Sequence, residues 1–435
     1  MFKKILFLIL ISAMLLGAFA SCAPDDAPIT ETTVATEPED TEPPAPSTLV
    51  FADNGETDFI VVRPEKAQGY YLDTASVVYQ KLKTLLSESF KLSEDWINPL
   101  EPSPEDRHEI LLFSTNRAES IQAAADLTFD GYIIRVTEHK VVIVGSNPTA
   151  CNEALYHFFD FIIPDHTKDG VTALPIGLEV KKEVDASSID FAEAMRSGKT
   201  VCADFEIVFK YPQKDGFTAA QGSATDGKYA YVIMKDSKSE SREIDRVVKI
   251  DMATWEVVLE SETMTLDHAN DMTYDPVNNI LIVTNMYENL VSIINPEDLT
   301  LIEQKKLPYG SWATGYVDGA GQYAFLAYGT PSGLVITDTS FNPIRSSALA
   351  SSEGYIGQGM DADANFAYVP LSPNAGKSDN VIQIYDIKTG EYLGNVSVAT
   401  KMESESMFHV GDDFYMHFNN VGSKIAILEF YISFE

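Results

Sequence analysis

The chain is short of cysteine and of positive charge. It has three Cys in 435 residues, and 31 Lys and Arg face 65 Asp and Glu, which gives a formal charge of −34. So few thiols cannot supply a disulfide framework, and they leave a zinc site unexpected. The acidic excess repels phosphate, so we expect no nucleic-acid partner.

Motifs of nucleophilic catalysis and phosphate binding are also missing. The sequence contains no Gly-x-Ser-x-Gly, no His-Glu-x-x-His and no phosphate-cradling Gly loop, and its seven His are scattered. Glu403 and Glu405 fall on one predicted strand and point the same way, without an opposed carboxylate for glycoside cleavage. The sequence leaves catalysis open and favours a protein that is not an enzyme.

Long apolar runs are confined to the N-terminus. Lys3 and Lys4 precede an apolar run from Ile5 to Leu16, which is the layout of a signal peptide over residues 1–21. The segment Phe19-Ala20-Ser21-Cys22 resembles the lipobox of bacterial lipoproteins. That resemblance implies lipidation of Cys22 (palmitate among the acyl groups) and a lipid anchor on the extracellular face of the cell membrane.

Residues 22–48 form the next segment, which we interpret as a lipidated, acidic, Thr/Pro-rich linker. After Cys22 it holds six Pro, six Thr and seven acidic residues, without Lys or Arg. Such a composition has nothing to bury and is typical of an extended tether.

Strand-like and helical patterns alternate over residues 49–184, which predicts an α/β domain. We expect strands after Thr57 and after His108, helices over about 70–89, 117–125 and 148–162, and a hairpin around Glu138-His139. The phrases DFIVVRPE, ILLFSTNRAES and DGYIIRVTEHKVVIVGSNPTACNEALYHFFDFII resemble the small domain that precedes the barrel in family 20 hexosaminidases and bacterial α-glucuronidases. No such barrel follows here, so the resemblance implies association with polysaccharide and not hydrolysis.

Residues 201–435 contain a repeat of β-rich phrases. DGKYAYVIM, NNILIVTNM, GQYAFLAYG, ANFAYVPLS and GDDFYMHFN are each followed by a second phrase with one polar landmark. The landmarks are Asp251, Asn295, Asp338, Asp386 and Glu429, at spacings of 44, 43, 48 and 43 residues. Periods of this length are typical of four-stranded propeller blades.

Five repeats predict an all-β propeller of five blades, and the fold class as a whole is α+β and multidomain. The strand-like ADFEIVFKYP from Ala203 lies outside the first repeat, and we expect it to pair with ILEFYISF near the C-terminus. This pairing would close the ring and remove two exposed edges. A β-sandwich with coincidental spacing is the alternative. The phrases QGSATDGKYAY, LDHANDMTYDP and IGQGMDAD resemble five-bladed propeller domains of uncharacterised exported Gram-positive proteins.

A polar column precedes the first strand of each predicted blade. Stepping back five residues from an aligned Asp column gives four polar positions in five, with aromatic residues and a histidine just before them. Amide, carboxylate and aromatic groups around a channel mouth suit a sugar. The alternative is that these groups tie the blades together. The predicted ligand-binding residues are Gln221, His268, Asn270, Asp271, Trp312, Tyr355, Gln358 and Glu405.

His268-Ala269-Asn270-Asp271 also resembles the Asn-Asp of calcium-dependent propeller lactonases. That resemblance implies calcium near Asn270 and Asp271, with His268 as a candidate base. We otherwise predict no cofactor and no metal, since an Asp here would more often cap a turn.

Together the patterns favour a non-catalytic surface lipoprotein. We expect it to bind a glycan or another extracellular ligand at the propeller channel mouth, with membrane lipid, through Cys22, and polysaccharide as partners. The alternatives are a calcium-dependent carbohydrate lyase or lactonase, and a scaffold that binds a cell-surface protein.

Overall fold

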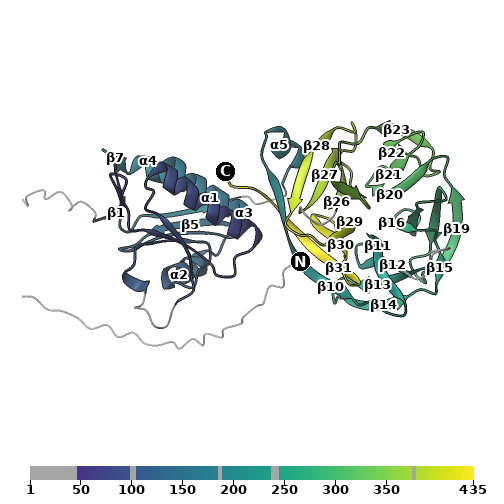
Figure 1. Ribbon diagram of the computed structural model, residues 1–435, viewed down its shortest axis with the longest axis horizontal. Coiled ribbons are helices and arrows are strands. Elements are labelled where there is room, and N and C mark those ends of the chain that lie inside the picture. Colours follow the sequence, from purple (N-terminus) through teal and green to yellow (C-terminus); the bar gives the residue numbers. More distant parts are fainter. Residues whose placement is uncertain (1–46, 98–103, 185–188, 237–243, 375–378) are drawn as a thin grey trace, which may run out of the picture. The chain divides into compact units, whose positions relative to one another are not determined.

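The computed structural model describes residues 47–97, 104–184, 189–236, 244–374 and 379–435 (Figure 1). Cys22, the predicted signal peptide and nearly all of the predicted linker lie outside these residues. No helix within the described ranges is long and apolar enough to cross a membrane.

Residues up to Glu183 form an α/β fold around a six-stranded sheet of order β3-β2-β4-β6-β5-β9. Strands β2, β3, β4 and β6 are parallel, while β5 pairs antiparallel with β6 in the predicted hairpin. A separate three-stranded sheet has the order β1-β8-β7. The strands are β1 (Thr48–Asp53), β2 (Ile60–Arg63), β3 (Lys91–Glu94), β4 (Glu109–Leu112), β5 (Gly131–Val136), β6 (Lys140–Gly145), β7 (Thr167–Lys168), β8 (Val171–Pro175) and β9 (Glu179–Glu183).

Helices cover both faces of the six-stranded sheet, because its central strands are apolar on both sides. Ile110 belongs to a core with helices α1 and α3, whereas the adjacent Leu111 packs in a second core with α2. The predicted helix over 148–162 is interrupted: α3 passes into a π-helix and then a short α4. The helical segments are α1 (Gly69–Leu85), a 3-10 turn (Pro104–Asp106), α2 (Ala118–Asp126), α3 (Pro148–His157), the π-helix (Phe158–Ile162), α4 (Ile163–Asp165) and α5 (Phe191–Arg196).

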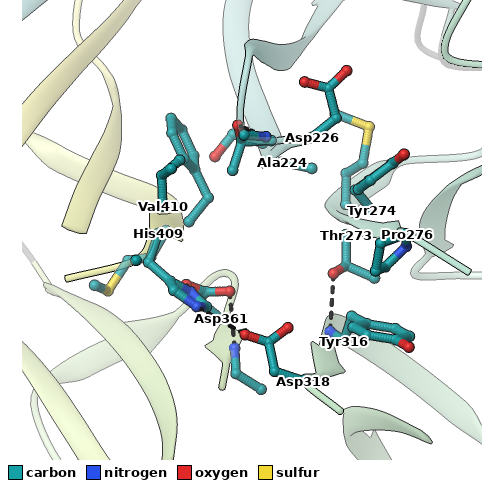
Figure 2. A pocket seen from close by; sticks show the side chains of 18 residues that line it. Ala224, Asp226, Thr273, Tyr274, Pro276, Tyr316, Asp318, Asp361, His409 and Val410 are labelled. Atoms are coloured by element: carbon teal, nitrogen blue, oxygen red, sulfur yellow. Dashed lines mark hydrogen bonds and ion pairs between the residues drawn. The ribbon is translucent and has the colours of Figure 1, made fainter. Parts of the chain in front are cut away.

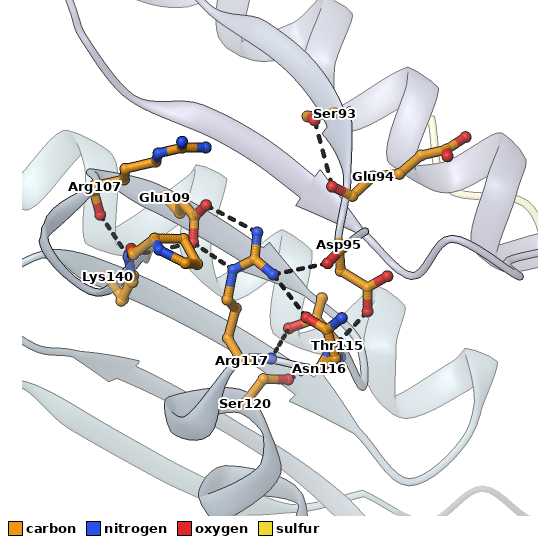
Figure 3. Close-up of polar contacts among 11 residues, drawn as sticks. Ser93, Glu94, Asp95, Arg107, Glu109, Thr115, Asn116, Arg117, Ser120 and Lys140 are labelled. Carbon is orange, nitrogen blue, oxygen red and sulfur yellow. Dashed lines mark hydrogen bonds and ion pairs between the residues drawn. The ribbon is translucent and has the colours of Figure 1, made fainter. Parts of the chain in front are cut away.

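A buried ion cluster joins the first residues of the central strands β4 and β6 (Figure 3). The guanidinium of Arg117 donates to both oxygens of Glu109, and Lys140 Nζ lies 3.2 Å from the same carboxylate. Lys140 also donates to two backbone carbonyls, those of Pro104 and Arg107. Every one of these charges is buried and paired, so the cluster has a structural explanation.

The described residues from Val201 onward are mostly antiparallel sheet. Three sheets are built from consecutive strands, in the orders β11-β12-β13-β14, β16-β17-β18-β19 and β20-β21-β22-β23. A nine-stranded sheet contains two further four-stranded groups, β24/β25-β26-β27-β28 and β29-β30-β31-β10. The predicted closing pair is confirmed: β10 runs antiparallel to β31 from Val201 to Tyr211.

The strands of the β-rich part are β10 (Val201–Tyr211), β11 (Phe217–Thr225), β12 (Tyr229–Asp236), β13 (Ile244–Asp251), β14 (Glu256–Glu260), β15 (Met264–Thr265), β16 (Ala269–Asp275), β17 (Ile280–Asn285), β18 (Leu290–Ile294), β19 (Leu301–Lys306), β20 (Gly310–Val317), β21 (Gln322–Tyr328), β22 (Gly333–Thr337), β23 (Pro343–Ser347), β24 (Tyr355–Gly357), β25 (Asp361–Ala362), β26 (Phe366–Pro373), β27 (Asn380–Asp386), β28 (Tyr392–Val398), β29 (Glu403–Val410), β30 (Asp413–Asn419) and β31 (Ser423–Ile432).

The first strands of these five groups, β11, β16, β20, β25 and β29, contact one another in cyclic order. Apolar clusters lie between successive groups. Tyr231 of β12 packs with Met272 of β16, Ile282 of β17 with Tyr323 of β21, and Tyr368 of β26 with Met416 of β30. Each sheet thus buries both faces against its neighbours, which a single sheet could not do alone.

The polar landmarks of the repeat hold turns. Oδ1 of Asp251 accepts hydrogen bonds from the backbone N–H groups of Ala253 and Thr254, and Asp386 holds those of Lys388 and Thr389 in the same way. Asp and Asn favour turns because a short side chain can reach the backbone two residues ahead. Glu429, the fifth landmark, lies within β31.

Candidate functional site

The buried carboxyl of Asp271 joins the first strands at their centre. Its Oδ2 accepts from the N–H groups of Thr314 and Met360, both at 2.9 Å, and its Oδ1 accepts from Ser406 Oγ at 2.6 Å. Ser406 Oγ lies 3.4 Å from the carbonyl of Ser223, on β11. Burial raises the pKa of Asp271 well above its usual range, and the donors oppose that shift.

The strands approach so closely here that a side chain would not fit. A Cβ on Gly222 would lie 2.5 Å from Cα of Asp271, closer than two carbon atoms can approach. The sequence pattern Gln221-Gly222-Ser223 therefore reflects packing at the centre of the sheets.

Three other predicted residues lie buried beside Asp271. Nδ2 of Asn270 donates to the carbonyls of Trp312 and Gln358, and Nε2 of Gln221 donates to the carbonyl of Ala220. Glu405 is also buried, and burial, reinforced by the Glu403 carboxylate, raises the pKa of Glu405 well above its usual range. The amide of Asn270 links neighbouring groups of strands, as the alternative interpretation of the polar column expected.

The remaining predicted residues, His268, Trp312, Tyr355 and Gln358, are half-buried. Nδ1 of His268 lies 3.0 Å from Lys235 Nζ, and the Trp312 ring stacks on Tyr328 with centroids 6.3 Å apart. The predicted residues thus fall into two groups: buried residues that connect strands, and half-buried residues that are mostly aromatic. Ligand binding by these residues stays a prediction.

A cavity of about 250 Å³ lies at the opposite end of the first strands (Figure 2). Along β16, for example, the predicted Asn270 stands near the start of the strand, whereas Thr273 and Tyr274 line the cavity near its end. The lining residues come from all five groups of strands and are Ser223, Ala224, Thr225, Asp226, Gly227, Met272, Thr273, Tyr274, Pro276, Tyr316, Asp318, Asp361, Ala362, Met407, Phe408, His409, Val410 and Gly411.

His409 is clamped between two carboxylates at one wall of the cavity. Its Nδ1 lies 2.6 Å from Oδ2 of Asp361, and its Nε2 lies 3.3 Å from Oδ2 of Asp318. The charge of Asp361, together with that of Asp318, raises the pKa of His409 to about 11 against the effect of burial. The ring is therefore an imidazolium at neutral pH with both nitrogens occupied, and it cannot act as a general base.

Asp226 lines the cavity from the turn between β11 and β12. Its Oδ1 accepts from the N–H groups of Lys228 and Tyr229, and its Oδ2 accepts from Tyr231 Oη. Asp363 makes the same three kinds of contact in the turn before β26. Asp363 is not among the lining residues, so it is a natural reference for the turn function of Asp226.

The cavity carries negative charge. Three carboxylates, those of Asp226, Asp318 and Asp361, face a single imidazolium, and the lining includes neither Lys nor Arg. Ser223 also belongs to the lining, but its Oγ is buried and has no hydrogen-bond partner among the described residues.

Within the described ranges, no group of three or more His, Cys, Asp or Glu is placed to hold a metal ion. The cysteines Cys151 and Cys202 are free. The predicted calcium near Asn270 and Asp271 stays a prediction without a donor set in the described residues to support it.

Sequence reasoning missed His409, because a histidine inside the strand phrase SESMFHV carries no local signal. Asp318 and Asp226 belong to the Asp column that aligns the repeats, so their shared position at the end of each first strand was the available signal.

Comparisons with known proteins find no matching family model and no matching curated protein. Similar solved structures include a glutaminyl cyclase from Myxococcus xanthus (10% identity, TM-score 0.37, 54% of this chain and 99% of that one). A hydrazine synthase from Kuenenia stuttgartiensis matches at 14% identity with a TM-score of 0.31, over 48% of this chain and 57% of that one. A putative exported protein from Bacteroides fragilis matches at 10% identity with a TM-score of 0.32, over 52% of this chain and 95% of that one.

Proposed function

We propose that the protein is a non-catalytic surface lipoprotein whose residues 201–435 form a five-bladed β-propeller that binds a hydroxyl-rich ligand, a glycan, at the end of its axis. The cavity of about 250 Å³, lined from all five groups of strands, carries this proposal. Its volume is below the range of drug-sized sites and suits one sugar unit of a chain.

The lining offers both kinds of contact that a sugar uses. Carboxylate oxygens of Asp226 and Asp318 can accept hydrogen bonds from hydroxyl groups, while Tyr274, Pro276 and Val410, which are not buried, offer apolar surface for C–H groups. His409 is protonated and hydrogen-bonded through both ring nitrogens, which argues against a catalytic base in this cavity. The resemblance of residues 49–184 to a domain of polysaccharide-degrading enzymes agrees with a glycan ligand.

A glycan array tests the proposal with the Cys22→Ser chain, which removes only the lipid. We expect retention of at least one class of glycan and its loss in Asp318→Arg, which places a long side chain at the cavity. Glu303→Arg is the matched control, because it makes the same charge change on the exposed strand β19. Binding of no glycan by the folded protein would end the proposal, and glycan-independent capture of one cell-surface protein would favour the scaffold.

The proposed anchor is tested separately. Labelling of cells with a tagged palmitate analogue should mark the wild-type chain and not Cys22→Ser. Equal labelling of the two would contradict a lipid on Cys22.

A further inference from the structure

We propose that the ligand of this cavity carries a protonated amino group, as a sugar with a free amine does. The inference rests on the proposed function and adds the chemical class of the ligand. It follows from the charge balance, the acceptor positions and the apolar surface of the lining.

The charge of the cavity is not neutralised from within. His409 compensates one of the three carboxylates, so the lining keeps a formal charge of −2. Both N–H groups of the imidazolium already donate to Asp361 and Asp318, so His409 has none left for the ligand. A neutral sugar would leave this charge unpaired, and an anionic one would be repelled.

Acceptor capacity remains on opposite sides of the cavity. Figure 2 shows Asp226 facing Asp318 across the opening, on turns that follow different first strands. Oδ2 of Asp318 accepts from His409, no described residue donates to Oδ1 of Asp318, and Oδ2 of Asp226 accepts from the phenol of Tyr231. An ammonium has three donors and no acceptor, which matches carboxylate oxygens offered from two sides.

Two further features favour a cation bonded to a sugar over a bare cation. The half-buried Tyr274 stands in the lining, where an aromatic ring attracts an ammonium. Pro276 and Val410 also belong to the lining, are not buried, and offer apolar contact to a sugar.

The experiment compares three tetrasaccharides with one glucose backbone: the form with free amines, its N-acetylated form and the form with hydroxyls at the same positions. Affinities are measured by calorimetry with the Cys22→Ser chain at a pH where the amine is protonated. We expect the amine form to bind about tenfold more tightly than either neutral form, which corresponds to about 1.4 kcal/mol.

Matched variants separate the cavity from the acidity of the whole chain. Asp318→Asn and Asp226→Asn should each remove most of the amine preference while the affinity for the neutral forms stays within about twofold. Asp363→Asn is the control, because it disturbs the same kind of turn as Asp226→Asn without touching the cavity. Melting temperatures of the two turn variants report any shared folding defect.

Three outcomes would contradict these expectations. Equal affinity for the amine and neutral forms would overturn the inference and leave the proposed function standing. If Asp363→Asn and Asp226→Asn reduce the preference for the amine form equally, that preference comes from the acidity of the whole chain. This result would overturn the inference as well. Binding of none of the three forms, together with no retained glycan on the array, would overturn the proposed function too.

Discussion

Aspartate serves three purposes in the β-rich part, and its surroundings decide which. Asp363 is bonded to its own turn, Asp271 is a fully buried acceptor between strands, and Asp361 fixes an imidazolium. One residue type at a repeated position therefore predicts a turn, but it does not predict which turn also borders a cavity.

The ion pairs of His409 should give stability a specific pH dependence. A histidine whose pKa is raised to about 11 in the folded state contributes stability that is fully present below its unfolded pKa of about 6.5. That contribution falls as the pH rises from there through the folded value. We expect His409→Gln to destabilise the protein most at about pH 6 and least at about pH 10, measured by urea unfolding.

The control for this prediction is His417→Gln. Burial lowers the pKa of His417 to about 3, so this side chain is neutral in both states above about pH 7 and its loss should not change the slope there. An equal loss of stability in His409→Gln at every alkaline pH would contradict the role of the ion pairs.

Asp271→Asn tests the central acceptor. An amide keeps one acceptor oxygen and presents an NH₂ where the second oxygen accepted, so at least one of the donors Thr314 N, Met360 N and Ser406 Oγ loses its partner. We expect a loss of about 2 kcal/mol in the free energy of unfolding. Asp338→Asn, in an exposed turn, should lower the free energy of unfolding much less. No change with Asp271→Asn would mean that the buried carboxyl of Asp271 does not stabilise the protein.

At the scale of elements, the second strands of the repeat were easier to predict than strand β9 and the π-helix. The phrases DGKYAYVIM, NNILIVTNM and GQYAFLAYG are the second strands β12, β17 and β21, whose continuous apolar runs follow from burial on both faces. Strand β9, with sequence EVKKE, has no such pattern; it pairs with β5, and Val180 packs against the core. The π-helix after α3 was likewise hidden, because its apolar residues continue a helical pattern.

The closing strand can be tested by proline substitution. Phe205 stands in the middle of β10, opposite Leu428 of β31. Phe205→Pro should break the ladder that joins the start of the β-rich part to its end, lowering the melting temperature and exposing the edge of β31 to aggregation. Val257→Pro, on the exposed strand β14, is the control and should have a smaller effect. Equal effects would deny β10 a special role.

At the scale of the whole molecule, the C-terminus completes the α/β core. Tyr431 and Phe434 are buried in the cluster that contains α1 and α3, and Nδ2 of Asn152 donates to the carbonyl of Ile432. The sequence assigned these residues to the β-rich part alone, since nothing in ILEFYISF indicates that its last residues pack among residues 49–184. Contacts between segments so distant in sequence are set by the fold and leave no local periodicity.

Phe434→Ala should therefore destabilise the α/β part. The side chain is 1% exposed, and removal of a buried Phe ring costs about 3 kcal/mol. Hydrogen exchange should rise in α1 and α3 and stay unchanged in β16–β18. Val277→Ala, at a side chain 75% exposed, is the control and should change stability by less than about 0.5 kcal/mol. Unchanged exchange in α1 would contradict the packing.

The sequence indicated that the candidate site lies on the first strands, but not at which end of these strands the cavity opens. Repeat alignment placed polar residues at both ends of most first strands, and the composition of the column favoured the end with Gln221, Asn270 and Glu405. Whether a polar column opens into a cavity depends on how closely the strands approach, as at Gly222, and that distance is a property of the assembled sheets.

The position of β10 and β31 has a consequence for synthesis. A ribosome releases β10 long before its partner β31. Until β31 and Phe434 have been made, both the ladder of β10 and the place of Phe434 in the α/β core stay open, so every product truncated before β31 carries two incomplete surfaces. Quality-control proteases should therefore recognise chains that stop before β31, however much of the rest of the molecule they contain.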